Sequence, residues 1–463
     1  MKMVTRRGII LWILCFLFLF ASAFLVFSYA THARSWGMSI YNRHIYSHGE
    51  IVGAGTVYDC DGVVLAETVD GERVYAKDKD TRKATLHMVG DNKRFRNSVQ
   101  YIFGDRLTGY NVINGVYSLV KNGSGEDLHL TLDSEICKVA YDELEGRKGT
   151  VAVVNYKTGD IICCVSTPTY DINNPPDDLD TNVEEYEGVF INRFLGAHYV
   201  PGSTFKIVTA ICAIENIPDV FERTWHCSGS FKPDAGGEII CNAEHGNIDF
   251  KTALAKSCNS VFAQIAIELG SEKLERTAKE LGIGSPVSIS GEMKSFAGEF
   301  GVKGTGEDLL GWTGIGQGKT RIAPATMLRI VSAIANGGSA ASMNILHGST
   351  LDKAGELLNI DIPKGTTKLM DADTADAIKD MLRNNVKKQY GDDSYPGLNL
   401  CAKSGTAQID SVDEHNIAWF TGFMDDDSCP YAFVVAIEHG NSGSRTAGPV
   451  ANRVMQAVAK KYR

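Results

Sequence analysis

The sequence YVPGSTFK (Tyr199–Lys206) runs directly into an apolar pattern of helical period over Ile207–Ile214. A Pro-Gly pair interrupts the preceding segment, so the pattern predicts a helix that begins near Ser203. Lys206 lies about one turn further along the same face, so a hydroxyl and an amine meet there. A helix N-terminus also offers free N–H groups and the positive end of the helix dipole, which favour developing negative charge.

Taken alone, an S-x-x-K pattern has a simpler interpretation, an N-capping serine followed by a solvated lysine. Two later segments favour a catalytic role for this pattern over that simpler interpretation. The segment Lys256–Asn259 (KSCN) interrupts an apolar helical pattern, and it presents the Ser257 hydroxyl and the Asn259 amide from a helix junction. The segment Lys403–Thr406 (KSGT) closes an apolar strand pattern, where Gly405 permits close backbone approach. Each segment alone fits a helix cap or an edge strand with a turn, but the three together are much harder to dismiss.

Composition sets broad limits on the kind of protein. The chain has 463 residues, which is too long for a single domain with one ordinary core, so two or more domains are expected. Hydrophobic residues make up 44% and charged residues 22%, as in globular proteins with an ample core. The net charge is -10 and no long Lys/Arg cluster stands out, so a nucleic-acid partner is not indicated.

The N-terminus predicts a membrane anchor. Ile9–Tyr29 is a nearly continuous apolar run without charge, and at about 1.5 Å per residue it can cross a hydrocarbon core of about 30 Å. A cleavable signal peptide is the alternative, because Ala21–Ala23 resembles a cleavage site. The apolar run continues past that point through Phe27, which favours an uncleaved anchor. Basic residues upstream place the short N-terminus in the cytoplasm and the rest of the chain outside.

The chain has 11 cysteines, an odd number that argues against complete disulfide pairing. Cys227 and Cys241 are the best candidates for a bridge. Together with His245 they also suggest a metal site, but the spacing is not a zinc signature and a fourth ligand is missing. We therefore assign no metal from the sequence.

The order of the elements predicts the fold class. From residue 149 onward, strand patterns at both ends enclose a region of helices, which indicates one sheet built from both ends with a helical layer inserted. The predicted helices are Ser203–Glu215, Phe250–Leu269, Glu272–Leu281, Pro324–Asn336, Ala372–Val386 and Pro449–Lys461, and the predicted strands are Thr150–Tyr156, Asp160–Val165, Leu398–Ser404, Asn416–Met424 and Tyr431–Glu438.

The segment before residue 146 has short strand signals and no catalytic constellation. Gly55–Tyr58 and Val63–Ala66 read as a hairpin with an Asp-Gly turn. Further on, Leu128–Leu132 alternates like a strand and Ile136–Leu144 is typical of a helix.

Much later in the chain, Gly314–Thr320 (GIGQGKT) resembles a P-loop out of register, and we interpret it as a structural turn.

The three motifs resemble those of the penicillin-binding proteins and serine β-lactamases. From about Leu128 to the C-terminus the chain is similar to the transpeptidase domain of class B penicillin-binding proteins, and its small first module resembles the shorter, PbpA-type members. Upstream the similarity weakens, because Ala54 and Cys60 stand where the family usually has arginines. The segments that carry the match are Leu130–Asp133, Ser166–Asn173, Asn192–Arg193, Pro201–Lys206, Ser257–Asn259, Ile315–Gly318, Lys403–Gln408 and Trp419–Phe423.

The resemblance implies an α/β (α+β) fold of the β-lactamase/transpeptidase type. Its three-layer domain has a central, mainly antiparallel sheet flanked by helices, with an inserted helical subdomain, a preceding small α+β module and one transmembrane helix. The expected divisions are a cytoplasmic tail at 1–7, the anchor at 8–30, a pedestal module at 31–145 and the transpeptidase domain at 146–463.

The resemblance also implies roles for the catalytic residues. Ser203 would be the nucleophile and Lys206 its base, provided that part of the lysine is neutral. Burial and the charge of Lys403 would both lower the pKa of Lys206. Ser257 would relay a proton to the leaving amine, and Asn259 would hold a substrate amide.

The strand motif would complete the site. Backbone N–H groups of Ser203 and Thr406 would form the oxyanion hole. The hydroxyls of Ser404 and Thr406, beside Gly405 and with Lys403, would bind a terminal carboxylate. His245 and His415 are expected to have packing or hydrogen-bonding roles.

The expected function is a single-pass, outward-facing D,D-transpeptidase of the bacterial cell membrane. It would cross-link D-Ala-D-Ala stem peptides through an acyl-Ser203 intermediate, release D-Ala, and be acylated by β-lactams without a cofactor. One alternative is a D,D-carboxypeptidase or β-lactamase, and another is a non-catalytic β-lactam sensor or scaffold. By resemblance, a polytopic glycan polymerase of the SEDS type is the expected membrane partner.

Overall fold

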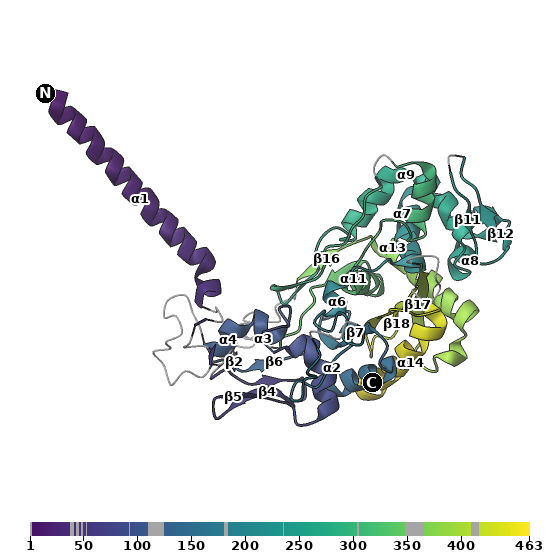
Figure 1. Cartoon of the computed structure of the whole chain (residues 1–463). Helices are drawn as coiled ribbons and strands as arrows, with labels where there is room; N and C mark the ends of the chain where they lie inside the picture. Colours follow the sequence, from purple (N-terminus) through teal and green to yellow (C-terminus); the bar gives the residue numbers. More distant parts are fainter. Residues whose placement is uncertain are drawn as a thin grey trace.

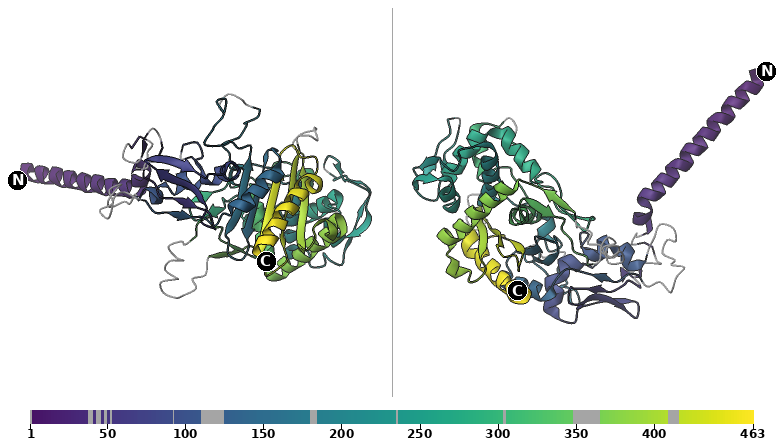
Figure 2. Two further views of the ribbon diagram at one scale, coloured as in Figure 1. Left: turned by 90° about the horizontal axis from the view of Figure 1, so that it is seen from below. Right: turned by 180° about the vertical axis from the view of Figure 1, so that it is seen from behind.

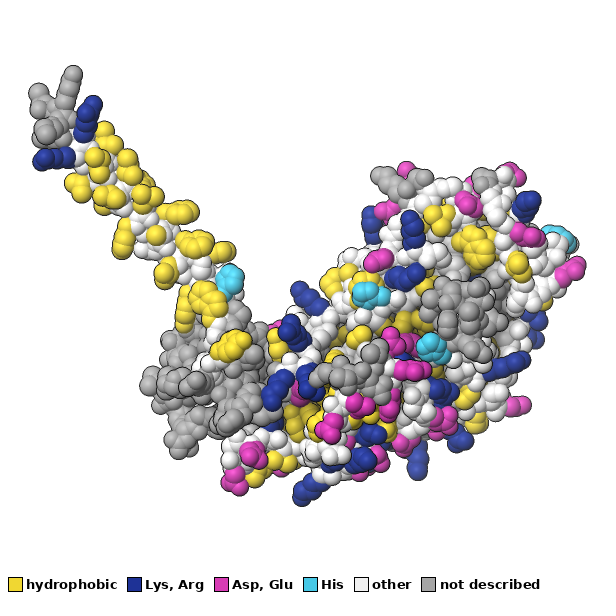
Figure 3. All heavy atoms as spheres, viewed as in Figure 1, with side chains coloured by type: hydrophobic (Ala, Val, Ile, Leu, Met, Phe, Trp, Pro, Cys, Tyr) yellow, Lys and Arg dark blue, Asp and Glu magenta, His cyan; other side chains and the backbone are white. Residues whose placement is uncertain are grey.

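The structure is a computed structural model that describes residues 2–37, 41–42, 46–47, 50–51, 53–91, 93–109, 125–179, 184–234, 236–302, 305–347, 365–408 and 416–463. Helix α1 (Lys2–Gly37) projects away from the rest of the chain (Figure 1). Within it, Thr5–Tyr29 has a mean hydropathy of 2.9 and is long and apolar enough to cross a membrane. Its large apolar side chains from Ile9 to Tyr29 are exposed, with basic residues near the N-terminal end (Figure 3).

A sheet in the strand order β17-β18-β19-β7-β8 forms the centre of the larger part of the chain. All neighbouring strands are antiparallel, and the register aligns Gly405 with Trp419, Trp419 with Ala436, and Ala436 with Thr150. This confirms one sheet made from both ends of the domain. The strands are β7 (Gly149–Asn155), β8 (Ile161–Thr167), β17 (Leu400–Ala407), β18 (Ile417–Met424) and β19 (Tyr431–Ile437).

Helices cover the sheet and complete the α/β layering. Every residue of β18 and β19 is buried, so neither face of these strands is open to solvent. Helices α11 (Pro324–Ala335) and α14 (Gly448–Tyr462) both contact these strands. The other helical segments of this part are α5 (Ser134–Leu144), α6 (Arg193–Gly196), α7 (Lys206–Asn216), α8 (Phe250–Ala255), α9 (Asn259–Glu280), α10 (Glu307–Gly314), α13 (Ala372–Asn385), the 3-10 turns Gly202–Phe205 and Asp392–Ser394, and the π-helical turns Val386–Tyr390 and Gly443–Ala447.

The helical layer carries small hairpins. The bounds of one pair of helices in it differ from the prediction. The sequence predicts one helix over Phe250–Leu269 and another from Glu272. The helix junction predicted at Lys256–Asn259 is present between α8 and α9, whereas the predicted break after Leu269 is only a kink at Gly270 (φ 77°), through which α9 continues. The short strands are β9 (Thr224–Cys227), β10 (Ser230–Phe231), β11 (Ile239–Ile240), β12 (Gly246–Asp249), β13 (Ser288–Ile289), β14 (Met293–Lys294), β15 (Ser339–Ala341) and β16 (Thr366–Lys368).

The N-terminal module lies between α1 and the central sheet (Figures 1 and 2). The predicted hairpin is present as β3 (Val57–Tyr58) and β4 (Val64–Val69), although its strands are shifted by up to three residues. The other elements are β1 (Tyr46–Ser47), β2 (Glu50–Ile51), β5 (Glu72–Tyr75), β6 (Leu128–His129), α2 (Lys79–Val89), α3 (Val99–Ile102) and α4 (Gly104–Thr108).

Helix α5 joins the module to the sheet, because it contacts α2 on one side and β8 and α14 on the other. The carboxylate of its N-cap, Asp133, accepts a hydrogen bond from the Tyr462 hydroxyl at 2.8 Å. The same carboxylate forms an ion pair with Lys461 Nζ at 2.9 Å. The division of the chain at residue 145 therefore stays a prediction, since α5 contacts both parts.

A buried ion pair fixes the segment that leads to Ser203. Arg193 Nε donates to Glu438 Oε1 at 2.7 Å, and the Tyr199 hydroxyl donates to the same oxygen at 2.5 Å. The Arg193 side chain is only 5% exposed, whereas the Lys157 and Asp427 side chains of a surface pair are 43% and 94% exposed.

We predict that Arg193→Ala lowers the free energy of unfolding by about 3 kcal/mol, because it leaves the largely buried Glu438 carboxylate without its partner. The matched change Lys157→Ala removes an exposed pair and costs less than about 1 kcal/mol. Denaturant unfolding of the full chain in detergent micelles, followed by tryptophan fluorescence, measures both values. Equal losses in the two variants would contradict this account.

Candidate active site

The Ser203 segment is a tight turn that leads into a helix. Gly202–Phe205 forms a single 3-10 turn, and α7 begins at Lys206 rather than at Ser203 as the sequence predicted. Gly202 has a φ of 52°, and its N–H donates to the Gly316 carbonyl at 3.0 Å. The turn raises Ser203 to the surface of the cleft, while Lys206 points into the interior and is fully buried.

Two glycines allow the backbone segments around Ser203 to approach one another. A Cβ on Gly405 would lie 2.9 Å from Thr204 Cγ2 and 3.0 Å from Thr204 N, so strand β17 packs directly on the Ser203 turn. A Cβ on Gly316 would lie 2.0 Å from the Gly202 carbonyl oxygen. The Gly-rich segment that resembles a P-loop is therefore a structural support of this turn, and the close approach expected at Gly405 is made by the protein's own backbone.

Lys206 is the centre of the hydrogen-bond network. Its Nζ lies 2.8 Å from Ser203 Oγ, 2.7 Å from Asn259 Oδ1, 2.9 Å from the Ser257 carbonyl oxygen and 3.2 Å from Ser257 Oγ. Burial lowers the pKa of Lys206 to about 7, although the nearby sulfurs of Cys241 and Cys258 act in the opposite direction. The amine is thus largely able to accept a proton from a hydroxyl near neutral pH.

Ser257 stands between the two lysines. It occupies the junction between α8 and α9 with a φ of 53°, a left-handed conformation that is strained for a serine. Lys403 Nζ donates to Ser257 Oγ at 3.0 Å and to the Ser404 carbonyl at 2.7 Å. The hydroxyl of Ser257 therefore links Lys206 and Lys403, as the sequence predicts for a proton relay.

Burial and the charge of Lys403 are the two expected causes of a lowered Lys206 pKa. Burial is confirmed as the main cause of the lowered pKa, and the charge of Lys403 is not among its causes. Burial, and then the charge of Lys206, hold the pKa of Lys403 well below its ordinary value. Lys403 is 1% exposed and lies beneath the cleft.

Strand β17 presents an open edge to the cleft, because it is the first strand of the sheet. The Ser404 N–H donates to the Tyr390 hydroxyl at 2.8 Å, which shows that it points away from β18. Alternate residues of a strand direct their N–H groups to the same side, so the Thr406 N–H also points away from β18. The Thr406 Oγ1 accepts a hydrogen bond from the Gly443 N–H at 3.2 Å, which leaves its own proton for a ligand.

These elements surround a cleft of about 530 Å³. Ser203, Ser257 and Asn259 line one part of it, and Ser404 and Thr406 line another. The arrangement joins a serine hydroxyl, a buried amine and outward N–H groups, which is what an acyl-transfer reaction requires. Asn259 Nδ2 donates to the Ile240 carbonyl at 2.9 Å and keeps a second hydrogen for a ligand.

Comparison with known proteins agrees with this geometry. Residues 149–456 match the family model described as the penicillin-binding protein transpeptidase domain. The chain belongs to this family. That family membership confirms the expected resemblance to class B penicillin-binding proteins and their fold.

Two curated relatives illustrate the similarity. The chain is 26% identical over 376 residues to the peptidoglycan D,D-transpeptidase MrdA of Haemophilus influenzae, covering 72% of this chain and 56% of MrdA. It is 24% identical over 375 residues to the peptidoglycan D,D-transpeptidase PbpA of Mycobacterium tuberculosis, covering 72% of each.

Solved structures have the same fold. The D,D-transpeptidase domain of a peptidoglycan glycosyltransferase from Eggerthella lenta superposes with a TM-score of 0.71 at 25% identity, covering 88% of this chain and 98% of that one. Penicillin-binding protein A from M. tuberculosis, as a ceftriaxone acyl-enzyme complex, gives a TM-score of 0.73 at 20% identity with the same coverage.

Sequence reasoning missed several residues of this penicillin-binding protein. The Tyr390 hydroxyl donates to Ser404 Oγ at 2.8 Å, and Asn385 Nδ2 in turn donates to the Tyr390 oxygen at 3.1 Å. Burial raises the pKa of Tyr390, so the phenol stays neutral and orients the Ser404 hydroxyl. Their positions at the end of a helical pattern gave no signal, because only the fold brings this π-helical turn to β17.

The cysteines also differ from the prediction. Cys227 and Cys241 are free thiols, so the bridge proposed for them is not formed. One of the two reasons for assigning no metal, the lack of a fourth ligand, is wrong, because Cys258 lies beside Cys227, Cys241 and His245. His415, the second histidine of interest, lies outside the described residues.

We predict that Gly405→Ala slows acylation by fluorescent penicillin by at least about tenfold, because the added Cβ displaces the turn that orients Ser203. Gly301→Ala is the control, since a Cβ there meets nothing within 4 Å. Labelling of the purified full chain, quenched at a series of times, measures both rates. An unchanged rate in Gly405→Ala would show that the contact between β17 and the Ser203 turn does not set the position of the nucleophile.

Proposed function

We propose that the chain is a membrane-anchored peptidoglycan D,D-transpeptidase that acts through an acyl-Ser203 intermediate. The observation that carries this proposal is the position of Lys206 Nζ, 2.8 Å from Ser203 Oγ in a buried site that lowers the pKa of Lys206 to about 7. A serine needs a neutral base to become a nucleophile, and this lysine supplies one at neutral pH.

Acylation follows from the contacts of Lys206. The neutral amine takes the Ser203 proton while Oγ attacks the carbonyl carbon of the penultimate D-Ala. The N–H groups of Ser203 and Thr406 stabilise the resulting oxyanion. Ser257 Oγ lies within 3.2 Å of Lys206 Nζ and 3.0 Å of Lys403 Nζ, so it can pass a proton to the leaving D-Ala amine.

Substrate binding is assigned to the opposite wall. The hydroxyls of Ser404 and Thr406 donate to the terminal carboxylate, and Gly405 keeps the strand close to the Ser203 turn. Lys403 supports this wall from beneath through its hydrogen bonds to Ser257 Oγ and the Ser404 carbonyl. Asn259 offers its free amide hydrogen to the backbone of the stem peptide. The amine of a second stem peptide then attacks the ester and releases Ser203.

We assign the catalytic domain to the outer face of a bacterial cell membrane, with α1 as the single span. The support is the basic flank of the apolar run, since short cytoplasmic segments are enriched in Lys and Arg. The pedestal module at 31–145 and the transpeptidase domain at 146–463 are then both extracytoplasmic. A polytopic glycan polymerase of the SEDS type is the proposed partner, contacted through α1 and the module.

A hydrolase that hands the acyl group to water, such as a D,D-carboxypeptidase or β-lactamase, is the second candidate, because it would use the same acylation residues. The membrane anchor and the preceding module favour the transpeptidase. A non-catalytic sensor or scaffold is disfavoured by the complete network around Lys206. The lifetime of the penicillin adduct separates a β-lactamase from the transpeptidase.

We predict that Ser203→Ala abolishes covalent labelling by fluorescent penicillin and leaves the melting temperature unchanged, because it removes only the nucleophilic oxygen. Ser285→Ala, at an exposed position, retains full labelling. In the wild type the adduct should persist for many minutes. Persistent labelling of Ser203→Ala would refute the nucleophile, and release of the wild-type adduct within seconds would indicate a β-lactamase.

We predict that the acylation rate rises with pH and reaches half of its maximum near pH 7. The pKa of Lys206 is lowered to about 7 by burial, and the amine is a base only above that pKa, so the rate increases as the proton leaves. Lys206→Arg should acylate very slowly at every pH, because a guanidinium keeps its proton. A rate that is constant between pH 5.5 and 8.5 (a span of about 3 units around this pKa) would exclude Lys206 as the base.

A further inference from the structure

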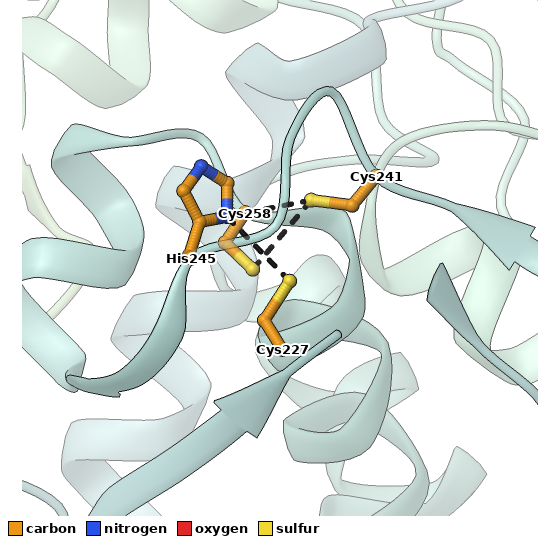
Figure 4. A group of neighbouring side chains, drawn as sticks. All are labelled: Cys227, Cys241, His245 and Cys258. Atoms are coloured by element: carbon orange, nitrogen blue, oxygen red, sulfur yellow. Dashed lines mark hydrogen bonds between the residues drawn. The ribbon is translucent and has the colours of Figure 1, made fainter. Parts of the chain in front are cut away.

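Four metal-binding side chains converge behind the Ser257–Asn259 motif. Cys227 ends strand β9, Cys241 follows β11, His245 precedes β12, and Cys258 is the N-cap of α9. Their ligand atoms all lie within 4.8 Å of one another, and the His245 ring points its Nδ1 toward the sulfurs (Figure 4). They lie at the end of the domain that carries β11, β12 and α8, far from α1 (Figure 1).

The separations match the edges of a zinc tetrahedron. His245 Nδ1 is 3.5 Å from Cys227 Sγ and 3.6 Å from Cys241 Sγ, and the sulfurs of Cys241 and Cys258 are 3.7 Å apart. With Zn–S bonds of about 2.3 Å and Zn–N bonds of about 2.0–2.1 Å, a tetrahedral ion places two sulfurs about 3.8 Å apart and a sulfur and a nitrogen about 3.6 Å apart.

We propose that Cys227, Cys241, His245 and Cys258 bind one zinc ion in a tetrahedral Cys₃His site. Three thiolates and an imidazole are the ligands that zinc prefers, and binding releases the three thiol protons to solvent. With four protein ligands, no position is left for water or substrate, so the site is structural. The sequence spacing of the four ligands does not indicate a zinc site, because Cys258 comes from a different element and lies inside the S-x-N motif.

Backbone N–H groups are directed at two of the sulfurs. The Asn259 N–H lies 3.3 Å from Cys241 Sγ, and the Val261 N–H lies 3.5 Å from Cys258 Sγ. Backbone donors of this kind orient ligating sulfurs and stabilise their charge. Cys227 and Cys258 are fully buried and Cys241 is 8% exposed, so solvent does not compete for them.

The second cluster of potential ligands in the described part of the chain has a different explanation. Cys60, Asp61 and Asp133 also lie close together. The Lys461 ammonium group already lies among them, with its Nζ 2.5 Å from Asp61 and 2.9 Å from Asp133. This cluster is an ion-pair network in which the lysine supplies the positive charge.

The zinc site would position catalytic residues. Cys258 lies between Ser257 and Asn259, and Cys241 lines the cleft. Ser257 holds a strained φ of 53°, a conformation that persists only when its neighbours are fixed. Coordination of Cys258 fixes the residue that follows Ser257, while Cys227, Cys241 and His245 tie the β9–β12 segment to α9. This role in acylation rests on the proposed function, whereas metal binding does not.

The direct test measures zinc in the full chain purified in detergent micelles without chelators. We expect about one zinc per wild-type chain and a loss of most of it in His245→Ala. The control is His226→Ala, an exposed histidine on β9 whose Nδ1 contacts Asn247 instead, and it should keep its zinc. Equal zinc in wild type and His245→Ala would overturn the assignment.

A second measurement uses the wild type alone and so does not depend on how the variant folds. After zinc is removed under reducing conditions, addition of Co²⁺ should produce sulfur-to-cobalt charge-transfer absorption and the intense visible bands of tetrahedral cobalt, which zinc then displaces. A reduced wild-type chain that binds neither metal would overturn the proposal.

The positioning role is tested through acylation. Zinc removal should slow fluorescent-penicillin labelling of the wild type by about tenfold or more, and zinc addition should restore it. An unchanged rate in zinc-free chain would refute positioning while leaving the metal site intact. Wild type that binds zinc but is never labelled would instead refute the proposed function.

Discussion

The burial of two lysine side chains around one serine hydroxyl is the constraint on which the site depends. Lys206 and Lys403 are at most 1% exposed, and both contact Ser257 Oγ. A pKa lowered from 10.5 to about 7 corresponds to a penalty of roughly 5 kcal/mol on the charged form of Lys206. The fold must supply that energy, and its large apolar core, formed by both faces of the central sheet and the helical layer, does so. The result is a base that is neutral enough to act at neutral pH.

Close backbone packing holds Ser203 against Lys206. The Ser203 turn is enclosed by β17 on one side and the Gly316 turn on the other, and no side chain fits at Gly405 or Gly316. The Trp419 indole adds a hydrogen bond to the Val200 carbonyl at 2.9 Å from the next strand. Because three segments far apart in sequence touch through their backbones, Ser203 has little room to move. Trp419 is fully buried, and its polar atom has a specific structural role.

Sequence patterns identified the sheet, most helices and the members of all three motifs. Those features depend on local periodicity and short spacings, which a single sequence displays. The missed features depend on tertiary contacts. Tyr390 reaches Ser404 because a π-helical turn after α13 lies beside β17, and no local pattern predicts that contact. Repulsion between the two lysines is present, but it lowers the pKa of Lys403, and the motifs do not indicate which of two neighbouring groups is more strongly desolvated.

The S-x-N motif illustrates how one segment can serve chemistry and architecture together. Ser257 and Asn259 contact Lys206 from one side of the junction between α8 and α9. The intervening side chain, Cys258, points the other way, into the group formed with Cys227, Cys241 and His245. Adjacent side chains that project to opposite sides of a junction cannot move independently, so whatever fixes Cys258 also fixes the relay hydroxyl and the amide. The β9–β12 segment has short strands and little apolar core of its own, and a cross-link at its base restrains it against α9 without requiring more buried surface. In the proposed mechanism, the position of the Ser257 hydroxyl thus depends on a cluster that takes no part in the reaction.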